Sequence, residues 1–484
     1  MSDLKKLEPA LVWQYFSEIL EIPRPSKKEE KIIQYLMGFG AAHDLPTKKD
    51  KAGNVLISKP ATPGKEHVPP VVLQSHVDMV CEKNSDVEHD FEKDPIKAIV
   101  DGEWVTAEGT TLGADDGIGV AAQLAILASK DLEHGPIECL FTTDEETGLT
   151  GAFALESGFF TGKTLLNLDS EDEGELFIGC AGGIDTVARF KYKKQRLPKN
   201  YVSVRVMVSG LKGGHSGDEI HKGLGNSNKI LARFLWEATE KYKMRLVNFD
   251  GGNLRNAIPR EASAIVAVAP KRFKELRQEM MEFKPQVEFE YALTEPQLKI
   301  ECEDIALPRY AIDKRTQRNL LRSLLACPHG VIQMSSRMPG LVETSTNLAS
   351  VKFKDKKIIE ITTSQRSDID SAKHMIATQV SAVFELAGAK VRHTDGYPGW
   401  SPNPESPIKT ITVAAYKDLF KVEPIVRSIH AGLECGLFKE KYPDLDMISF
   451  GPTLRNVHSP DERIHIGTVQ KFWDLLLEVL KRFE

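Results

Sequence analysis

The first 180 residues of the chain alternate between helical and strand-like patterns of apolar residues. Apolar residues at helical spacing predict helices over residues 10–22, 28–42 and 117–130. Short apolar runs bounded by glycine and proline predict strands over residues 53–58, 71–75, 137–143 and 165–168. Strands separated by helices of this length are typical of an α/β domain, so we predict a mostly parallel sheet covered by helices.

The pattern changes near residue 184. Polar and apolar residues alternate over 201–208 and 262–269, which predicts antiparallel strands with one solvated face, and residues 227–243 and 271–283 predict amphipathic helices. The glycine- and proline-rich stretch 396–402 indicates a linker, after which residues 406–484 return to helices and strands. We therefore predict one α/β domain from residues 1–183 and 398–484, interrupted by an inserted α+β domain of residues 184–397.

The composition of the chain bears on its partners and its cellular location. The 484 residues are 41% hydrophobic and 27% charged, with a net charge of −6, so nothing points to a nucleic-acid or anionic membrane partner. The first residues lack the apolar region of a signal peptide, and no apolar stretch approaches the roughly 18 residues that a membrane helix needs. Six scattered cysteines without a CxxC pair are typical of reduced thiols. We predict a soluble cytoplasmic protein.

Five short polar segments carry the candidate chemistry, and each follows an apolar run that resembles a strand. They contain His76 and Asp78, Asp115 and Asp116, Glu145 and Glu146, Asp169, and His458. Sites in open α/β sheets form beyond the carboxyl ends of the strands, so we expect these side chains to gather there. Histidine and carboxylate are ligands for zinc, cobalt or manganese, and one carboxylate can bridge two ions roughly 3.5–4 Å apart. The segments predict a two-metal hydrolase.

Some of these segments also have a purely structural interpretation. The pattern His76-Val-Asp78 recurs as His393-Thr-Asp395, which precedes the linker and which we predict to be structural. Asp115 could simply start a helix, because carboxylates favour helix N-termini. A phosphate-binding loop is disfavoured, since the glycines around this position do not form a GxxxxGK[ST] pattern.

The pair Glu145-Glu146 has an equivalent in Glu29-Glu30, which we predict to be solvated on a helix face. The difference is that Glu145 and Glu146 end a buried strand. Two like charges repel there unless a cation neutralises one of them. The conjunction of five such segments therefore favours the metal site over five independent structural roles.

Long matches around these residues resemble the aminoacyl-histidine dipeptidases, also called Xaa-His dipeptidases or bacterial carnosinases, within the co-catalytic di-zinc peptidases and acylases. The matching segments are 72–80, 109–115, 169–175, 180–183, 211–217, 255–259, 430–436, 451–453 and 458–462. The resemblance implies a catalytic domain with an inserted lid and dimerisation domain, a dipeptide substrate and a homodimer. It also implies two divalent ions per chain, with zinc preferred over cobalt or manganese.

The resemblance also implies roles for the metal-site residues. His76 and Asp169 would hold one ion, Glu146 and His458 the other, and Asp115 would bridge them. Asp78 would orient His76, and Glu145 would be the general base that takes a proton from the attacking water. Asp116 leaves an ambiguity at the bridging position. The wider group often has lysine where this chain has Gly117, which does not affect a ligand.

Three residues of the inserted domain are candidates for binding the substrate. His215, in a glycine-rich turn, would donate to the oxygen that becomes negative during hydrolysis, with a plain loop residue as the alternative. Arg366 would bind the free C-terminal carboxylate through its planar guanidinium, with Arg255 as the competitor. Asn256 would contact the substrate backbone. The alternative functions are a tripeptidase, a broader dipeptidase, an N-acyl amino acid hydrolase or a non-catalytic binding protein.

Overall fold

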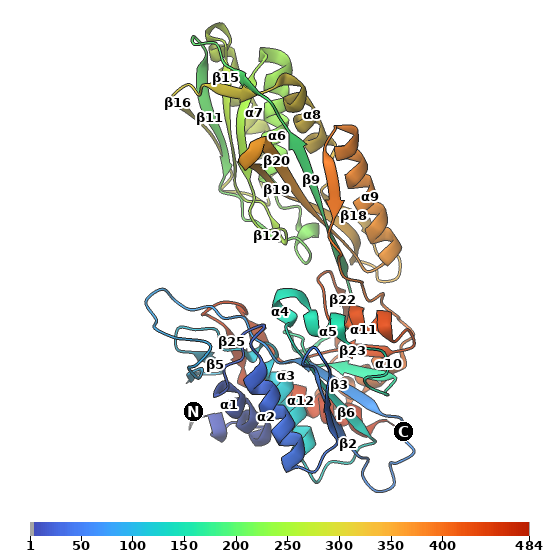
Figure 1. Ribbon diagram of the computed structural model, residues 1–484. Coiled ribbons are helices and arrows are strands. Elements are labelled where there is room, and N and C mark those ends of the chain that lie inside the picture. Colours follow the sequence, from blue (N-terminus) through green and yellow to red (C-terminus); the bar gives the residue numbers. More distant parts are fainter. Residues whose placement is uncertain (1–3, 484) are drawn as a thin grey trace. The chain divides into compact units, whose positions relative to one another are not determined.

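Two compact units make up the protein. The computed structural model describes residues 4–483 (Figure 1). Unit 1 contains the chain up to Gly179 together with Trp400–Ser428 and the residues from Leu433 onward. Unit 2 contains Cys180–Gly399 and the short segment Ile429–Gly432. Among the described helices, none is long and apolar enough to cross a membrane.

The main sheet of unit 1 has eight strands in the order β1-β2-β6-β3-β7-β23-β8-β22. Its centre is parallel and consists of β6 (Ile137–Thr142), β3 (Val71–His76), β7 (Thr164–Asn167) and β23 (Asp446–Ser449). The flanking strands are β1 (Thr47–Lys49), β2 (Val55–Lys59), β8 (Glu175–Cys180) and β22 (Ile425–Ile429). The predicted parallel sheet is confirmed at its centre. Strands β1 and β2 are antiparallel because a short turn joins them.

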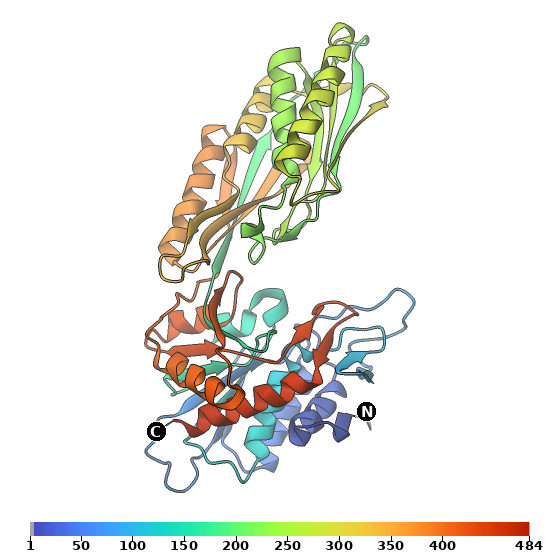
Figure 2. The same ribbon diagram turned by 180° about the vertical axis from the view of Figure 1, so that it is seen from behind.

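Helices surround this sheet, and a second, smaller sheet lies in the same unit (Figure 2). The longer helices are α1 (Ala10–Leu20), α2 (Glu30–Ala42), α3 (Ala114–Ala128), α10 (Pro407–Phe420) and α12 (Ile466–Lys481). The shorter ones are η1 (Leu4–Lys6), α4 (Glu145–Gly148), α5 (Thr150–Ala154) and α11 (Cys435–Lys441). The small sheet has the order β24-β25-β5-β4, with β24 (Leu454–Arg455), β25 (Arg463–His465), β5 (Trp104–Ala107) and β4 (Ala98–Asp101). The three helices predicted in the first 180 residues are confirmed, although α3 begins three residues earlier than predicted.

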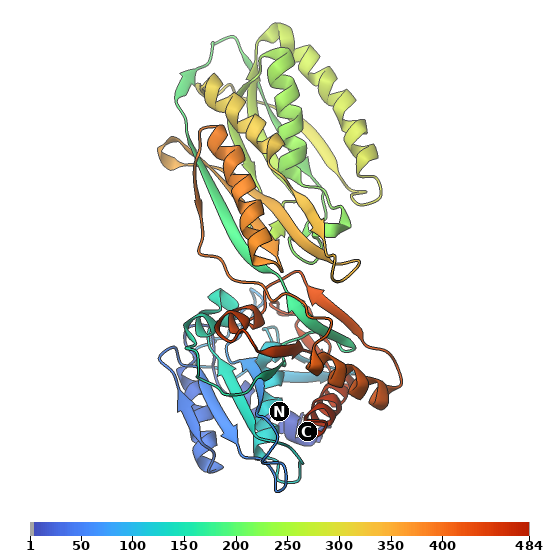
Figure 3. The ribbon, with the colours of Figure 1, turned by 90° about the vertical axis from the view of Figure 1, so that its right-hand side faces the viewer.

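Unit 2 is built on a nine-stranded sheet in the order β16-β11-β15-β13-β19-β20-β9-β21, with β18 also paired to β19 (Figure 3). The strands are β9 (Gly182–Lys191), β11 (Val202–Ser209), β13 (Arg245–Gly251), β15 (Ala262–Val268), β16 (Lys299–Ile305), β18 (Gly330–Met334), β19 (Val342–Lys354), β20 (Ile358–Ser367) and β21 (Lys390–His393). Its pairings are antiparallel, as the alternating pattern predicts. The remaining pairs are β10 (Lys194–Arg196) with β17 (Tyr310–Ile312) and β12 (Gly214–His215) with β14 (Ala257–Ile258).

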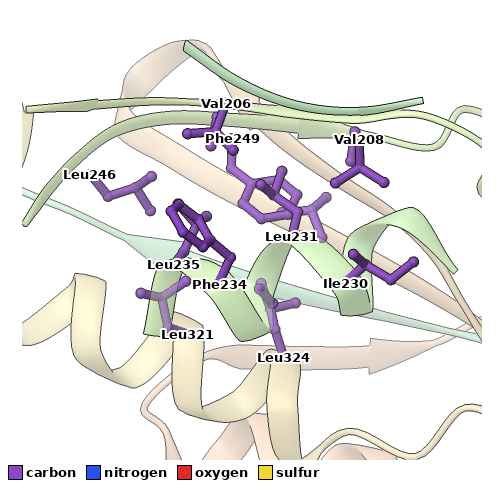
Figure 4. Packing of buried hydrophobic residues seen from close by; sticks show 14 of the residues in the cluster. Val206, Val208, Ile230, Leu231, Phe234, Leu235, Leu246, Phe249, Leu321 and Leu324 are labelled. Atoms are coloured by element: carbon purple, nitrogen blue, oxygen red, sulfur yellow. The ribbon is translucent and has the colours of Figure 1, made fainter. Parts of the chain in front are cut away.

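The core of unit 2 lies between this sheet and its helices (Figure 4). The helices are α6 (Ser227–Tyr242), α7 (Pro270–Glu290), α8 (Lys314–Ala326) and α9 (Asp370–Leu386), with short η2 (Ile220–Lys222) and η3 (Asp355–Lys357). The side chain of Asn226 accepts the N–H of Lys229 and so caps the start of α6. One face of α6 then buries Leu231 and Leu235 against strand residues such as Phe249. Burying each such side chain stabilises the fold by about 1.5–3 kcal/mol.

Candidate metal centre

Strand β3 delivers the first candidate ligand to the end of the parallel sheet. His76 is its last residue, and both His76 and Asp78 are buried. The Nδ1 atom of His76 lies 3.4 Å from Oδ1 of Asp78. Asp78 also accepts the backbone N–H groups of Glu145 at 3.0 Å and Glu146 at 3.2 Å. Burial opposes ionisation of Asp78, but His76 and the N–H group of Glu145 lower its pKa. A charged Asp78 can therefore orient the ring of His76.

The carboxylate of Asp115 lies between two histidines. Its Oδ1 is 3.2 Å from Nε2 of His76, and its Oδ2 is 3.1 Å from Nε2 of His458. Each oxygen thus faces a different imidazole, so this carboxylate could bridge two ions that are each held by one of these histidines. The neighbouring Asp116 is turned away, and its Oδ1 accepts the N–H of Gly119 at 3.2 Å. The geometry favours Asp115 over Asp116 at the shared position.

Two more carboxylates complete the two halves of the cluster. Oδ1 of Asp169 lies 3.5 Å from Nε2 of His76, and Oε2 of Glu146 lies 3.0 Å from Nε2 of His458. Potential ligand atoms fall within 4.8 Å of one another in the set His76, Asp115, Asp169 and in the set Asp115, Glu146, His458. Glu145 forms a further such set with His76 and Glu146. The two ligand sets therefore share one carboxylate.

The charges of this cluster fit a pair of cations. Burial, reinforced by nearby carboxylates, raises the pKa of Glu145 well above its usual range and that of Asp169 to about 7. Burial opposes protonation of His458, yet the carboxylates of Asp115 and Glu146 raise its pKa well above the usual value. Oε1 of Glu146 is buried without a hydrogen-bond partner in the described part of the protein. Divalent ions would relieve the repulsion between these buried carboxylates. Imidazole and carboxylate groups suit such ions as ligands.

Two of the five segments differ from the sequence prediction in where they lie. Asp115 sits in the first turn of α3, and His458 lies in the loop between β24 and β25, so neither follows a strand of the main sheet. The expectation that every segment lies at the end of a strand of the parallel sheet is wrong for these two, although the His458 segment does directly follow a strand, β24. The cause is the small sheet, in which β25 pairs with β5 and so joins the C-terminal loop to the segment before α3.

The prediction that Glu29 is solvated is also wrong. Glu29 is buried, and its Oε1 accepts the N–H groups of Lys27 at 2.9 Å and of Asp144 at 3.0 Å. It therefore fixes the turn that precedes Glu145. Helical spacing alone could not reveal this contact, because its partner lies more than a hundred residues later in the chain.

Three buried charged residues next to the cluster had no predicted role. Glu434 accepts hydrogen bonds from Gln74 at 2.6 Å and from the Thr142 hydroxyl at 2.7 Å, and burial raises its pKa to about 7. Arg24 and Glu462 contact the backbone around Asp115. Glu434 and Glu462 lie inside the segments 430–436 and 458–462 that resemble the aminoacyl-histidine dipeptidases. That position was the signal in the sequence that could have pointed to these two residues.

The three candidate substrate-binding residues belong to unit 2. His215 and Asn256 are neighbours, because β12 pairs with β14 and the N–H of Ser216 donates to the carbonyl of Asn256 at 2.8 Å. Arg366, on β20, is buried and donates to the Tyr397 hydroxyl at 3.1 Å. Burial and the charge of Arg366 lower the pKa of His215, so these two side chains share one electrostatic environment.

Arg255, the competitor of Arg366, has a different environment. Its guanidinium is mostly exposed and forms an ion pair with Asp185 at 3.0 Å. The Nε atom of Arg366, in contrast, is buried and has no hydrogen-bond partner in the described part of the protein. A buried guanidinium with an unused donor favours Arg366 as the group that binds an anion.

Comparison with known proteins identifies the family. The model of peptidase family M20/M25/M40 matches residues 72–482. The chain belongs to this family. A cytosol non-specific dipeptidase of Escherichia coli strain K12 is 45% identical over 481 residues, which cover 99% of each chain. The structure of an aminoacylhistidine dipeptidase from Vibrio alginolyticus is 45% identical, with a TM-score of 0.92 over 100% of this chain and 99% of that one.

A more distant structure shares the fold alone. It is a tripeptidase from Staphylococcus aureus, 17% identical over 98% of both chains with a TM-score of 0.56. The predictions of the aminoacyl-histidine dipeptidase resemblance, of the peptidase fold and of a hydrolase that acts on peptide bonds are confirmed. The family is metal-dependent, and the described residues include groups of histidine and carboxylate side chains that could hold metal ions.

Proposed function

We propose that this protein is a metal-dependent dipeptidase that hydrolyses Xaa-His dipeptides such as β-alanyl-histidine. The observation that carries the proposal is the position of Asp115, whose two oxygens face His76 and His458 at 3.2 and 3.1 Å. Glu145 lies in the same cluster. Full-length similarity to two dipeptidases supports the choice of substrate class.

Two divalent ions, zinc in preference to cobalt or manganese, suit the ligands of this centre. We assign one ion to His76 and Asp169 and the other to Glu146 and His458, with Asp115 shared. Bound ions of this kind lower the pKa of water and polarise a peptide carbonyl. Asp78 holds the ring of His76 in place, since metal-binding histidines donate their second N–H to such partners.

Glu145 is the proton carrier of the proposed reaction. As general base it takes a proton from the attacking water, and it then delivers that proton to the amine that leaves. The N–H of Glu145 is fixed by Asp78 at 3.0 Å, so the start of α4, which carries both Glu145 and Glu146, is set by the same carboxylate that orients His76.

The inserted domain, residues 184–397, supplies the proposed substrate-binding groups, while residues 1–183 and 398–484 form the catalytic domain. We assign His215 as the donor to the developing oxyanion, Arg366 as the partner of the C-terminal carboxylate and Asn256 as a contact of the substrate backbone. The burial of Arg366 and its unpartnered Nε support its role.

We also propose a homodimer through the inserted domain. We further propose a cytoplasmic location, and the cytosolic relative supports this location.

A broader dipeptidase is the second candidate. The observation that favours it is the name of the Escherichia coli relative, a cytosol non-specific dipeptidase that is 45% identical over 481 residues. The two candidates share the metal centre and the base. They differ only in how strongly the enzyme prefers histidine in the second position of the dipeptide.

A substrate panel tests the proposed function. Protein loaded with zinc or manganese is assayed on β-alanyl-histidine, other Xaa-His dipeptides, Xaa-Leu dipeptides and tripeptides. We expect metal-dependent cleavage with the largest kcat/KM for Xaa-His. Similar kcat/KM values for Xaa-His and Xaa-Leu would support the broader dipeptidase. Absence of cleavage with every metal would overturn the proposal.

Arg366→Ala should weaken binding of dipeptides much more than binding of their C-terminally amidated analogues. The lost charge-assisted hydrogen bonds are worth about 1.5–3 kcal/mol, so KM for the dipeptide should rise roughly 10- to 100-fold. The measurement is KM for both substrate types. Arg255→Ala is the matched control, because its exposed guanidinium pairs with Asp185, and KM should stay unchanged. Equal losses for both substrate types in the Arg366 variant would reject the carboxylate role.

A further inference from the structure

The turn Leu112–Asp115 carries the shared carboxylate, and two buried groups of opposite charge hold it. We infer that Glu462 and Arg24 are positioning residues of the metal centre, which fix Asp115 in place without contacting the substrate. The inference rests on the proposed function, because it assigns these residues a task in that same centre.

Glu462 binds the N–H side of the turn. Its Oε2 accepts the N–H groups of Leu112 at 2.7 Å and Gly113 at 2.9 Å. Its Oε1 accepts those of Ala114 at 2.8 Å and Asp115 at 3.3 Å. The side chain is 2% exposed, so these bonds are shielded from water. One carboxylate therefore fixes four successive peptide groups, the last of which belongs to the shared ligand.

Arg24 binds the carbonyl side of the same turn. Its guanidinium donates to the carbonyl of Gly113 and, at 3.0 and 2.9 Å, to those of Val77 and Asp78. It is 1% exposed. Gly113 is thus held at its N–H by Glu462 and at its C=O by Arg24. The guanidinium also joins the turn to the segment that follows His76.

Glycines make room for this arrangement. A Cβ atom added at Gly113 or at Gly117 would lie 2.6 Å from Nη2 of Arg24. Gly113 also has φ 71°, a conformation that glycine adopts without strain. The contact with Arg24 therefore explains why this chain has glycine at position 117, where the wider group often has lysine. In this chain the guanidinium of Arg24 needs the space beside residue 117.

The two contacts connect ligands that are far apart in the sequence. Glu462 follows His458 by four residues, and its carbonyl accepts the Thr106 hydroxyl at 2.9 Å, so the loop that carries His458 is tied to the Asp115 turn. Arg24 ties that turn to Asp78, the partner of His76. The segments that bear both histidines are thereby set against Asp115, whose oxygens face them.

Glu138 provides a matched comparison in the same unit. It is also a buried carboxylate that accepts backbone N–H groups, those of Thr161 and Gly162, both at 2.8 Å. Glu138 lies near the start of β6, whereas the metal cluster lies beyond the end of that strand. Removing its charge weakens the same kind of charge-assisted hydrogen bond without touching a segment that bears a ligand.

The test compares Glu462→Gln, Arg24→Lys and Glu138→Gln with the unchanged protein. An amide oxygen replaces only one of the two acceptors of Glu462, and an ammonium group cannot reproduce the planar fork of Arg24. We measure the affinity of each metal-free protein for zinc by competition with a chelator, the absorption spectrum after loading with cobalt, and the unfolding temperature without metal. We expect the first two variants to bind zinc about 10- to 100-fold more weakly, with an altered cobalt spectrum.

The Glu138 variant should unfold at a lower temperature and yet keep the zinc affinity and the cobalt spectrum of the unchanged protein. If Glu462→Gln and Arg24→Lys behave in that same way, their role is structural only and the inference is wrong. If either variant does not fold, the result of the other decides. Failure of the unchanged protein to bind zinc or cobalt would instead refute the proposed metal centre itself, so the two failures are distinguishable.

Discussion

Glu145→Gln should lower kcat for β-alanyl-histidine by about 10²- to 10⁴-fold, the usual contribution of a general base, while the metal content stays unchanged. The amide that replaces the carboxylate is close to it in size but cannot accept a proton from water. Both proposed ligand sets remain intact, because neither includes residue 145. One set is His76, Asp115 and Asp169, and the other is Asp115, Glu146 and His458. Steady-state kinetics and elemental analysis of the same sample provide the two readouts.

Glu156→Gln is the control for this prediction. Glu156 is an exposed residue of the same unit, a short distance along the chain from Glu145, and its change to glutamine should leave kcat and metal content as they are. Near-normal activity of the Glu145 variant would exclude Glu145 as the base. Loss of metal together with activity would show instead that Glu145 is a ligand.

His458→Ala should reduce the metal content from two ions to one per chain. Nε2 of His458 lies 3.0 Å from Glu146 and 3.1 Å from Asp115, so its removal breaks one ligand set. The other set, with His76 and Asp169, is left whole. Because a metal ion contributes several kcal/mol of stabilisation to the reaction, activity should fall by at least about 100-fold.

The control for the ligand role is His393→Ala. His393 belongs to the second His-x-Asp pattern of the chain, but its Nδ1 lies 2.9 Å from the Thr186 hydroxyl in unit 2. Its removal should leave two ions bound and activity unchanged. Elemental analysis that still finds two ions per chain in the His458 variant would contradict the assignment of His458 as a ligand.

The sequence predicted well what depends on periodicity and strand ends. His76 ends β3 and Asp169 comes shortly after β7, and these strands are parallel neighbours, so their carboxyl ends meet at one edge of the sheet. That geometry follows from apolar runs of the right length and needs no knowledge of distant contacts. The change from a parallel to an antiparallel sheet near residue 184 was predictable for the same reason, since alternation is a local property.

What the sequence did not predict depends on contacts between distant segments. The meeting of His458 and Asp115 was expected, but the small sheet that brings it about was not, because its two- to four-residue strands from both ends of unit 1 leave little pattern. The buried Glu29 accepts an N–H group from a segment more than a hundred residues away, and the buried Glu462 accepts four such groups. A glutamate that binds backbone N–H groups has the same local sequence as one on a solvated face.

The most direct test of the central claim is a metal titration of the chelated protein, with hydrolysis of β-alanyl-histidine as the readout. Zinc is added in steps, and activity is measured at each number of ions per chain. Two ligand sets that share Asp115 predict no activity in the metal-free protein and a rise that is complete at two ions per chain. Full activity without metal, or a rise that is complete at one ion, would contradict the account of a two-metal centre.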